Sequence, residues 1–268
     1  MQYKFLVLDL DGTLTNDKKE ITANTLQTLR KAQQKGIKLV LASGRPTYGI
    51  VPLSVELEMK EFGGYILSYN GGKIIDVSDM SVIYESTLPL ELVAPLHTAA
   101  KESNSVILTY QNEYILTEVP DDKYVGHELF LTKMKPKKVE NFSEAVDFAP
   151  DKCLIVGEPE NLIPLGEQLM QKYSDSLNAF RSEPFFLEVV PKGIDKAQSL
   201  QRLLDFTGDS KEQMVAVGDG FNDLSMIKFA GFGVAMANAQ DAVKEAADYI
   251  TLSNEEDGVA AVVEKFIL

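Results

Sequence analysis

The sequence predicts an α/β protein whose main sheet is parallel and is interrupted by an α+β module. In the first and last thirds of the chain, short apolar runs alternate with stretches of helical periodicity, and short turns join them. Strand–helix–strand units of this kind form parallel sheets with right-handed crossovers. In the middle third, hairpin patterns replace the alternation. The predicted domains are therefore residues 1–86 with 189–268, and an insertion at 87–188.

Each element follows from the spacing of apolar residues and from the residues at its ends. Short apolar runs bounded by turn residues predict buried strands, and apolar residues at helical spacing predict helices. Gly36 suits the end of the first helix and Pro46 the start of the second. The elements predicted outside the insertion are strands at 5–8, 37–42, 65–68, 213–217, 231–235 and 249–252, a hairpin at 73–86, and helices at 21–34, 46–59, 194–206, 224–229, 241–247 and 258–266. Those predicted within it are helices at 90–102, 121–131 and 161–173 and strands at 105–110, 113–118, 152–157, 176–181 and 185–190.

Composition restricts the possible partners. The 268 residues carry a formal net charge of -14, which argues against binding along a nucleic acid backbone. A small phosphate ester remains compatible, because one metal ion and one lysine can set the local charge. No apolar run approaches the length needed to span a membrane, and the single Cys153 fits a reducing cytosol. His97 and His127 stand apart from any zinc-like cluster.

The segment from Asp9 to Thr15 carries the strongest functional signal. Asp9 and Asp11 follow a predicted buried strand, where two nearby carboxylates repel and burial penalises both. A chain tolerates this where a cation lies between the acids or where the acids do chemistry. The alternative is an ordinary solvated turn at Gly12.

Other polar residues follow other predicted strands. Ser43 and Asp219 each come directly after a strand, and Lys196 begins a helix. In an open doubly wound, Rossmann-like sheet, ligands bind at the carboxyl ends of the strands, so these side chains are expected to converge. Each has a plain structural alternative: Ser43-Gly44 as a turn, Lys196 as a surface lysine, and the Gly218–Asp223 loop as turn chemistry. A calcium loop would require a downstream bidentate glutamate, which 228–230 does not offer.

Taken together, these motifs resemble the haloacid dehalogenase superfamily of phosphoryl-transfer enzymes. The resemblance covers the whole chain, and its four motifs fall in the expected order: Asp9–Thr15, Ser43-Gly44, Lys196 and Gly218–Asp223. It implies that Asp9 is a nucleophile that forms an aspartyl-phosphate. It implies that Asp11 is the general acid and base, a residue that separates phosphatases and phosphomutases from relatives that release halide.

The resemblance also assigns the remaining site residues. It implies a Mg²⁺ ion held by Asp9, the Asp11 backbone carbonyl and Asp219, with Asp223 acting on the metal directly or through a water molecule. Phosphate-binding groups are implied at the Leu10 and Gly44 backbone amides and at the side chains of Ser43, Lys196 and Asn222.

The insertion resembles the IIB-type cap of Cof-like phosphatases, which contacts the leaving group. Arg45 and Asn70 lie on core loops and are candidate substrate-side residues, with an ion pair and a turn former as their structural alternatives. The insertion also holds a lysine cluster, interpreted as a solvated face: Lys133, Lys135, Lys137 and Lys138.

The sequence thus predicts a cytoplasmic, Mg²⁺-dependent phosphatase of Cof type that acts on small phosphorylated metabolites, sugar phosphates first. Two alternatives remain open at this stage. One is a phosphomutase of sugar phosphates, and the other is a non-catalytic ligand-binding member of the fold. No nucleic acid or membrane partner is expected, and the sequence gives no indication of oligomeric state.

Overall fold

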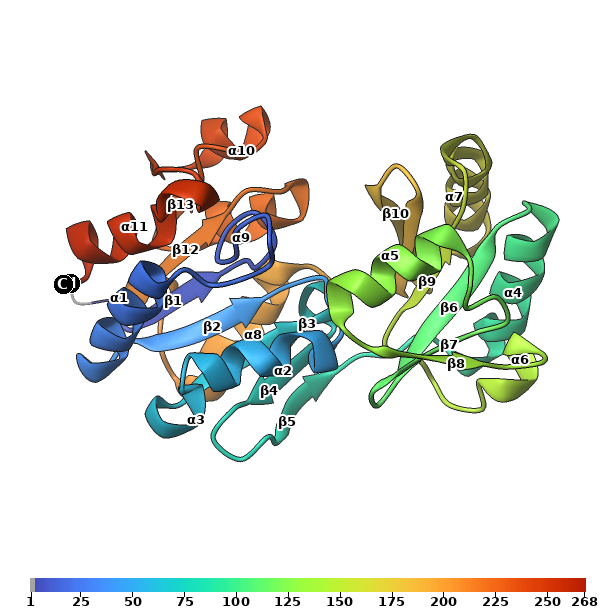
Figure 1. Ribbon diagram of the computed structural model, residues 1–268, viewed down its shortest axis with the longest axis horizontal. Helices are drawn as coiled ribbons and strands as arrows, with labels where there is room; N and C mark the ends of the chain where they lie inside the picture. Colours follow the sequence, from blue (N-terminus) through green and yellow to red (C-terminus); the bar gives the residue numbers. More distant parts are fainter. Residues whose placement is uncertain (1–2) are drawn as a thin grey trace. The chain divides into compact units, whose positions relative to one another are not determined.

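A computed structural model describes residues 3–268, which form two compact units (Figure 1). The core unit contains 3–84 and 195–268, and the inserted unit is Glu85–Ile194. The second junction therefore follows Ile194, beyond the boundary at 188/189 expected from the sequence. Strand β11 (Phe186–Pro191) explains the difference, because it pairs with strands β9 and β10 of the inserted unit and keeps its residues there.

The core unit is built on an eight-stranded sheet. Five neighbouring pairs, from β14 across to β3, are parallel, and β3 and β4 are antiparallel. The strands in spatial order are β14 (Tyr249–Ile250), β13 (Phe232–Ala235), β12 (Met214–Gly218), β1 (Phe5–Leu8), β2 (Lys38–Ala42), β3 (Gly64–Ser68), β4 (Lys73–Asp76) and β5 (Val82–Glu85). Strands β1 and β12 are buried along their whole length, as expected of a parallel sheet covered on both faces. The predicted α/β class is confirmed.

Helices joining the strands complete this unit. They are α1 (Ala23–Gln34), α2 (Thr47–Glu56), α3 (Met59–Phe62), α8 (Lys196–Thr207), α9 (Leu224–Phe229), α10 (Asp241–Ala246) and α11 (Gly258–Phe266). The Thr22 hydroxyl accepts a hydrogen bond from the Thr25 amide and caps the first helix. The prediction of one helix from Pro46 to about Met59 is wrong, because Glu58 adopts a left-handed conformation that ends α2 and separates it from α3.

The inserted unit pairs a six-stranded sheet with four helices. The strands in spatial order are β10 (Leu177–Glu183), β11, β9 (Cys153–Val156), β6 (Val106–Gln111), β7 (Tyr114–Thr117) and β8 (Lys135–Lys138). The helices are α4 (Val93–Glu102), α5 (Lys123–Thr132), α6 (Phe142–Ala145) and α7 (Pro159–Tyr173). Neighbouring strands are antiparallel except β7 and β8. The sequence prediction missed β8, since a lysine-rich exposed edge strand has no apolar face to signal it.

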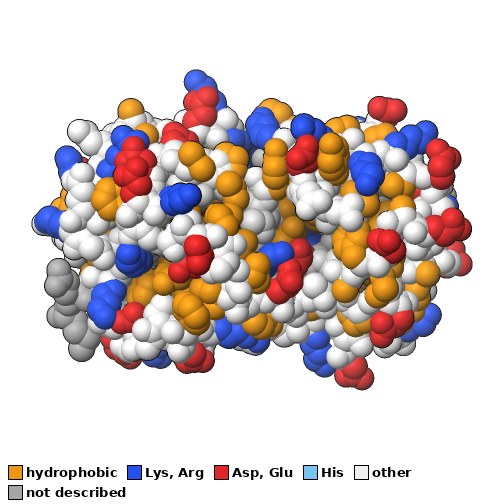
Figure 2. All heavy atoms as spheres, turned by 90° about the horizontal axis from the view of Figure 1, so that it is seen from below, with side chains coloured by type: hydrophobic (Ala, Val, Ile, Leu, Met, Phe, Trp, Pro, Cys, Tyr) orange, Lys and Arg blue, Asp and Glu red, His pale blue; other side chains and the backbone are white. Residues whose placement is uncertain are grey.

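The described part of the chain also contains five short 3₁₀ turns, at Tyr69–Gly71, Leu90–Leu92, Lys211–Gln213, Phe221–Asp223 and Asn254–Glu256. Among residues 3–268, no helix is both long and apolar enough to cross a bilayer. On the face drawn in Figure 2, acidic and basic side chains are interspersed rather than separated by sign. Cys153 is fully buried in the core of the inserted unit, and this burial raises the pKa of its thiol to about 12.

Candidate active site

Three neighbouring strands of the core sheet end in polar residues at the same edge. Asp9 follows β1, Ser43 follows β2 and Asp219 follows β12, and β1 lies between the other two strands. The strands are parallel, so their carboxyl ends share one edge of the sheet. The predicted convergence of these three motifs is therefore present in the structure.

Lys196 joins the first and last of these loops from the start of α8. Its Nζ lies 2.6 Å from Asp9 Oδ1 and 2.5 Å from Asp223 Oδ1, and its side chain is completely buried. Burial alone would lower the pKa of Lys196, but the charges of Asp223 and Asp9 outweigh it and raise the pKa. Lys196 is thus a fixed positive charge inside the site, and the surface-lysine alternative is wrong.

Three carboxylates cluster around this lysine. Asp9, Asp219 and Asp223 each offer an oxygen atom, and these oxygens all lie within 4.8 Å of one another. Burial, followed by the charge of Asp223, raises the pKa of Asp9 well above its usual value. Burial likewise raises the pKa of Asp219 to about 6, against an opposing hydrogen bond from Thr13. Three acids with one ammonium leave an excess of buried negative charge, which a bound cation would offset.

The donor set fits a hard divalent cation. Carboxylate oxygens are the ligands that Mg²⁺ and Ca²⁺ prefer, and raised carboxyl pKa values indicate oxygens that would be stabilised by added positive charge. The site is also shaped by Gly12, whose φ of +85° is left-handed. A Cβ at this position would lie 2.5 Å from Asp219 Oδ2, so only glycine allows the two loops to approach so closely. Thr13 Oγ1 donates to Asp219 Oδ1 at 2.6 Å and fixes its orientation.

Asp223 has a second role in the same loop. Its Oδ2 accepts hydrogen bonds from the backbone amides of Asp219 and Gly220, each at 2.9 Å. Its other oxygen accepts from Lys196. Asp223 therefore shapes the loop that presents Asp219 and also orients the lysine, whether or not it contacts a metal.

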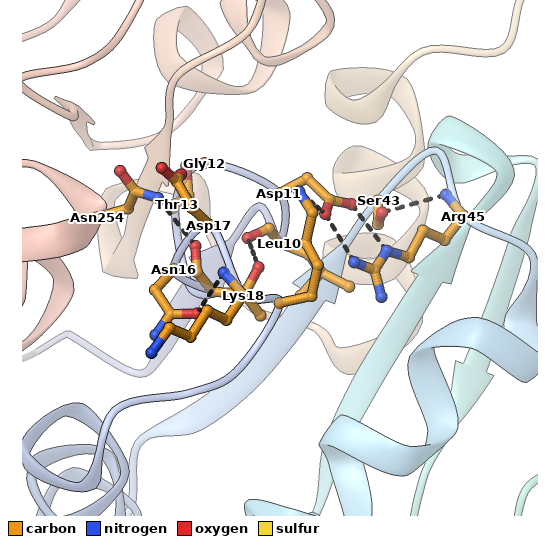
Figure 3. Close-up of polar contacts among 12 residues, drawn as sticks. Leu10, Asp11, Gly12, Thr13, Asn16, Asp17, Lys18, Ser43, Arg45 and Asn254 are labelled. Carbon is orange, nitrogen blue, oxygen red and sulfur yellow. Dashed lines mark hydrogen bonds and ion pairs between the residues drawn. The ribbon is translucent and has the colours of Figure 1, made fainter. Parts of the chain in front are cut away.

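The Asp11 side chain has other partners than Asp9. Arg45 donates two hydrogen bonds to it, from Nε to Oδ2 at 2.7 Å and from Nη2 to Oδ1 at 2.6 Å (Figure 3). Lys19 Nζ lies 2.8 Å from the same Oδ1. Burial alone would raise the pKa of Asp11, but the hydrogen bonds and charge of Arg45, together with Lys19, outweigh it and lower the pKa. Asp11 is therefore held as a carboxylate in this structure.

The remaining predicted residues line the adjoining loops. Ser43 is buried, and its Oγ accepts from the Arg45 amide at 3.1 Å. Asn70 is also buried, and its Oδ1 accepts from Asn222 Nδ2 at 3.1 Å. A Cβ placed on Gly44 would lie 3.2 Å from the Asn70 amide nitrogen, so Asn70 packs against both the second and the fourth motif.

Leu10 can contribute only backbone groups to a ligand. Its side chain is completely buried in the core. Its carbonyl accepts from the Thr15 amide and hydroxyl, each at 2.9 Å, which tightens the loop after β1.

Sequence reasoning overlooked two residues of this site. Thr13 lies inside the first motif, and a hydroxyl at this position could have indicated a hydrogen bond to another residue of the site. Lys19 lies in the charged run Asp17–Glu20, which reads as a solvated loop and gives no such signal. The structure brings both side chains onto carboxylates of the site.

Comparison with known proteins extends over the whole chain. The family model of the haloacid dehalogenase-like hydrolases matches residues 6–263 of the sequence. The 5-amino-6-(5-phospho-D-ribitylamino)uracil phosphatase YitU of Bacillus subtilis is 32% identical, with 97% of this chain and 96% of that protein covered. A haloacid dehalogenase-like hydrolase from Bacteroides thetaiotaomicron has a crystal structure that matches with a TM-score of 0.96 and 55% identity, covering 98% of this chain and 99% of that one.

A further solved structure carries a more specific description. The subclass IIB sugar phosphatase BT4131 matches with a TM-score of 0.83 and 26% identity, and the match covers 99% of this chain and 100% of that protein. The resemblance inferred from the four motifs is thus confirmed. The chain belongs to the haloacid dehalogenase-like hydrolases and is a phosphatase of their Cof type.

Proposed function

We propose that this phosphatase is Mg²⁺-dependent and hydrolyses small phosphorylated metabolites, sugar phosphates first, through a phosphorylated Asp9. The observation that carries the proposal is the cluster of buried Asp9, half-buried Asp219 and buried Asp223, with the Lys196 ammonium bound to Asp9 and Asp223. It combines a carboxylate nucleophile, a set of oxygen ligands and a fixed positive charge at one strand edge.

The first chemical step uses Asp9. One of its carboxylate oxygens attacks the phosphorus, a phosphorus–oxygen bond forms to Asp9, and the bond to the ester oxygen breaks. Lys196 lies within hydrogen-bonding distance of Asp9, so it can orient the nucleophile and stabilise charge on the transferring phosphoryl group. When bound, Mg²⁺ would offset the repulsion between the carboxylates and the phosphate dianion, with Asp9, the Asp11 carbonyl and Asp219 as its proposed protein ligands and Asp223 beside them.

Asp11 is the proposed acid and base. It would give a proton to the departing ester oxygen and then remove a proton from the water molecule that hydrolyses the aspartyl-phosphate. The Leu10 and Gly44 amides, the Ser43 hydroxyl and the Asn222 amide are the proposed donors to the phosphoryl oxygens. Arg45 and Asn70 are proposed to act on the substrate side of these loops.

The inserted unit, Glu85–Ile194, is the proposed cap that sets substrate specificity, and the core unit is the proposed catalytic domain. Two comparisons support sugar and polyol phosphates as substrates. YitU is named for a ribityl phosphate ester and BT4131 for sugar phosphates, so both names describe polyhydroxylated phosphate esters. A cytoplasmic location is also proposed, supported by the single buried Cys153.

A phosphate-release screen tests the function. Purified protein is incubated with sugar phosphates, polyol phosphates, nucleotides and cofactor phosphates, with Mg²⁺ or with a chelator. We expect release from sugar or polyol phosphates that requires the metal and disappears in Asp9→Asn, while Asp11→Asn loses at least about a hundredfold. Near-normal release by Asp9→Asn would contradict the nucleophile assignment. Conversion of a hexose 1-phosphate into its isomer without free phosphate, in the presence of a bisphosphate, would identify a mutase instead.

A further inference from the structure

Lys19 is a charged side chain at the site that no sequence motif accounts for. Its Nζ lies 2.8 Å from Asp11 Oδ1, and only 23% of its side-chain surface is exposed. Lys19 is thus directed inward from a loop whose neighbours Asp17 and Lys18 are exposed.

The loop that carries Lys19 is organised to present it. Lys19 has a left-handed φ of 64°, an unfavourable conformation for a lysine. The Asn16 Oδ1 accepts hydrogen bonds from the amides of Lys18 and Glu20, each at 3.0 Å, on either side of Lys19. The Lys19 amide itself donates to the Asn16 carbonyl at 2.9 Å. Asn16 therefore holds the backbone at and on either side of Lys19 in the conformation from which the lysine side chain reaches Asp11.

The loop is in turn anchored to the rest of the core unit. Asn254 Nδ2 donates to the Thr15 carbonyl at 3.1 Å, and the Asp17 amide donates to Glu255 Oε1 at 2.7 Å. These contacts come from a segment distant in the sequence, so the position of Lys19 does not depend on the loop alone.

The two cations on Asp11 bind it in different ways. Arg45 donates to both carboxylate oxygens, whereas the Lys19 ammonium makes a 2.8 Å contact with Oδ1. Oδ1 thus lies within reach of both cations, and the two side chains together fix the position of the carboxyl group.

We propose that Lys19 is a positioning residue for Asp11, which holds its carboxyl group at Oδ1 in the orientation needed for catalysis. The inference rests on the proposed acid and base role of Asp11. In the proposed cycle, the Asp11 carboxyl group, protonated from solvent before the first turnover, gives its proton to the ester oxygen as the phosphorus–oxygen bond breaks. In the second step, the resulting carboxylate takes a proton from the attacking water molecule and so regains the proton it gave. Lys19 touches neither substrate nor reacting atoms and acts through Asp11.

The test compares two esters that differ in their need for an acid. A sugar phosphate releases a strongly basic alkoxide that must be protonated, whereas p-nitrophenyl phosphate releases a weakly basic phenolate. The measured quantity is kcat/KM, which reports the steps up to loss of the leaving group even where hydrolysis of the aspartyl-phosphate limits kcat. Lys19→Met, Lys19→Arg and the matched control Lys18→Met are assayed on both esters, and their folding is compared by thermal unfolding.

We expect Lys19→Met to lower kcat/KM for the sugar phosphate by about tenfold or more and that for p-nitrophenyl phosphate by less than about threefold, within the range of acid catalysis. Lys19→Arg should recover most of the loss, and Lys18→Met should match the wild type. An equal loss on both esters would overturn the inference, because it would show a phosphate contact or a folding defect. No loss, or a gain in rate, would overturn it as well.

Asp11→Asn on the same two esters separates this inference from the function on which it rests. If Asp11→Asn is selective for the sugar phosphate and Lys19→Met is not, only the positioning role fails. If Asp11→Asn is not selective, the acid role fails and the inference fails with it. A wild-type enzyme that releases no phosphate from either ester overturns both.

Discussion

The Lys196 ammonium lies 2.6 Å from the Asp9 carboxylate, although the two residues are 187 positions apart in the sequence. The same ammonium reaches Asp223, so one buried cation compensates two buried anions from different loops. Charges buried in this way are strongly interdependent, since removal of one partner leaves the others without compensation. The lysine therefore supports the structure of the site and, in the proposed mechanism, its chemistry.

Replacing this lysine should have two separable effects. We expect Lys196→Met to abolish measurable turnover and, without metal, to lower the free energy of unfolding by about 3 kcal/mol or more. Added Mg²⁺ should restore part of that stability, because it compensates the carboxylate charge that the substitution leaves unpaired. It should not restore turnover. Phosphate release and thermal unfolding with and without Mg²⁺ measure both effects. Lys192→Met, at an exposed lysine a few positions earlier in the sequence, should change neither turnover nor stability. Equal turnover and stability of the two variants would contradict the role of Lys196.

Much of this site could be predicted from the sequence because its positions are set by the sheet. Apolar runs identify β1, β2 and β12, and parallel pairing then brings whatever follows them to one edge. The placement of Asp9, Ser43 and Asp219 needs no knowledge of side-chain contacts. The same reasoning works less well for Lys196, whose burial depends on partners that only the folded chain reveals.

The features that escaped prediction depend on long-range contacts or local backbone strain. Arg45 and Lys19 bind Asp11 from two loops, the one after β2 and the one that also carries Asp11. Nothing in a charged run distinguishes the inward lysine from its neighbours. The break between α2 and α3 rests on a left-handed Glu58, a residue type with no preference for that conformation. Strand β8 forms only because β7 offers a partner edge, since its own residues are exposed.

Metal binding should weaken in acid because of Asp219. Its pKa of about 6 in the folded, metal-free protein lies above its usual value, so protons and metal compete for its carboxylate below that pH. We expect the dissociation constant for Mg²⁺ to rise about tenfold between pH 7 and pH 5, with any protonation of Asp9 adding to the effect. Isothermal titration calorimetry across this range measures it, and a dissociation constant that is independent of pH would contradict the prediction.

The same raised pKa fixes the sign of the effect on stability. The folded, metal-free protein binds the Asp219 proton more tightly than the unfolded chain, so this group favours folding at low pH and loses that contribution as the pH rises through about 6. Stabilisation by Mg²⁺ should therefore be larger at pH 7 than at pH 5. Asp219→Asn should reduce this dependence, whereas Asp175→Asn, at an exposed aspartate, should leave it unchanged.

Gly12 offers a test of how closely the first and fourth motifs must approach. A Cβ on Gly12 would overlap Asp219, so we expect Gly12→Ala to displace Asp219, weaken Mg²⁺ binding and lower kcat by at least about tenfold. The matched control is Gly36→Ala, which has a similar left-handed φ of +92° but no atom within 4 Å of the added Cβ. The control should lose about 1 kcal/mol of stability and keep its activity. If the two variants lose activity equally, the backbone conformation rather than the contact with Asp219 is responsible.

Asn70 joins two motifs that are proposed to bind phosphate, and its loss should appear mainly in substrate affinity. Asn70→Gly keeps the left-handed φ of 57° accessible while it removes the amide that contacts Asn222 and Gly44. Loss of one such hydrogen bond is worth about 1 kcal/mol, so we expect KM to rise roughly fivefold with a smaller change in kcat. Asn104→Gly is the matched control, since Asn104 has a φ of 51° on an exposed loop of the inserted unit. Steady-state kinetics with a sugar phosphate compare the two variants, and identical KM values would show that Asn70 serves only to form its turn.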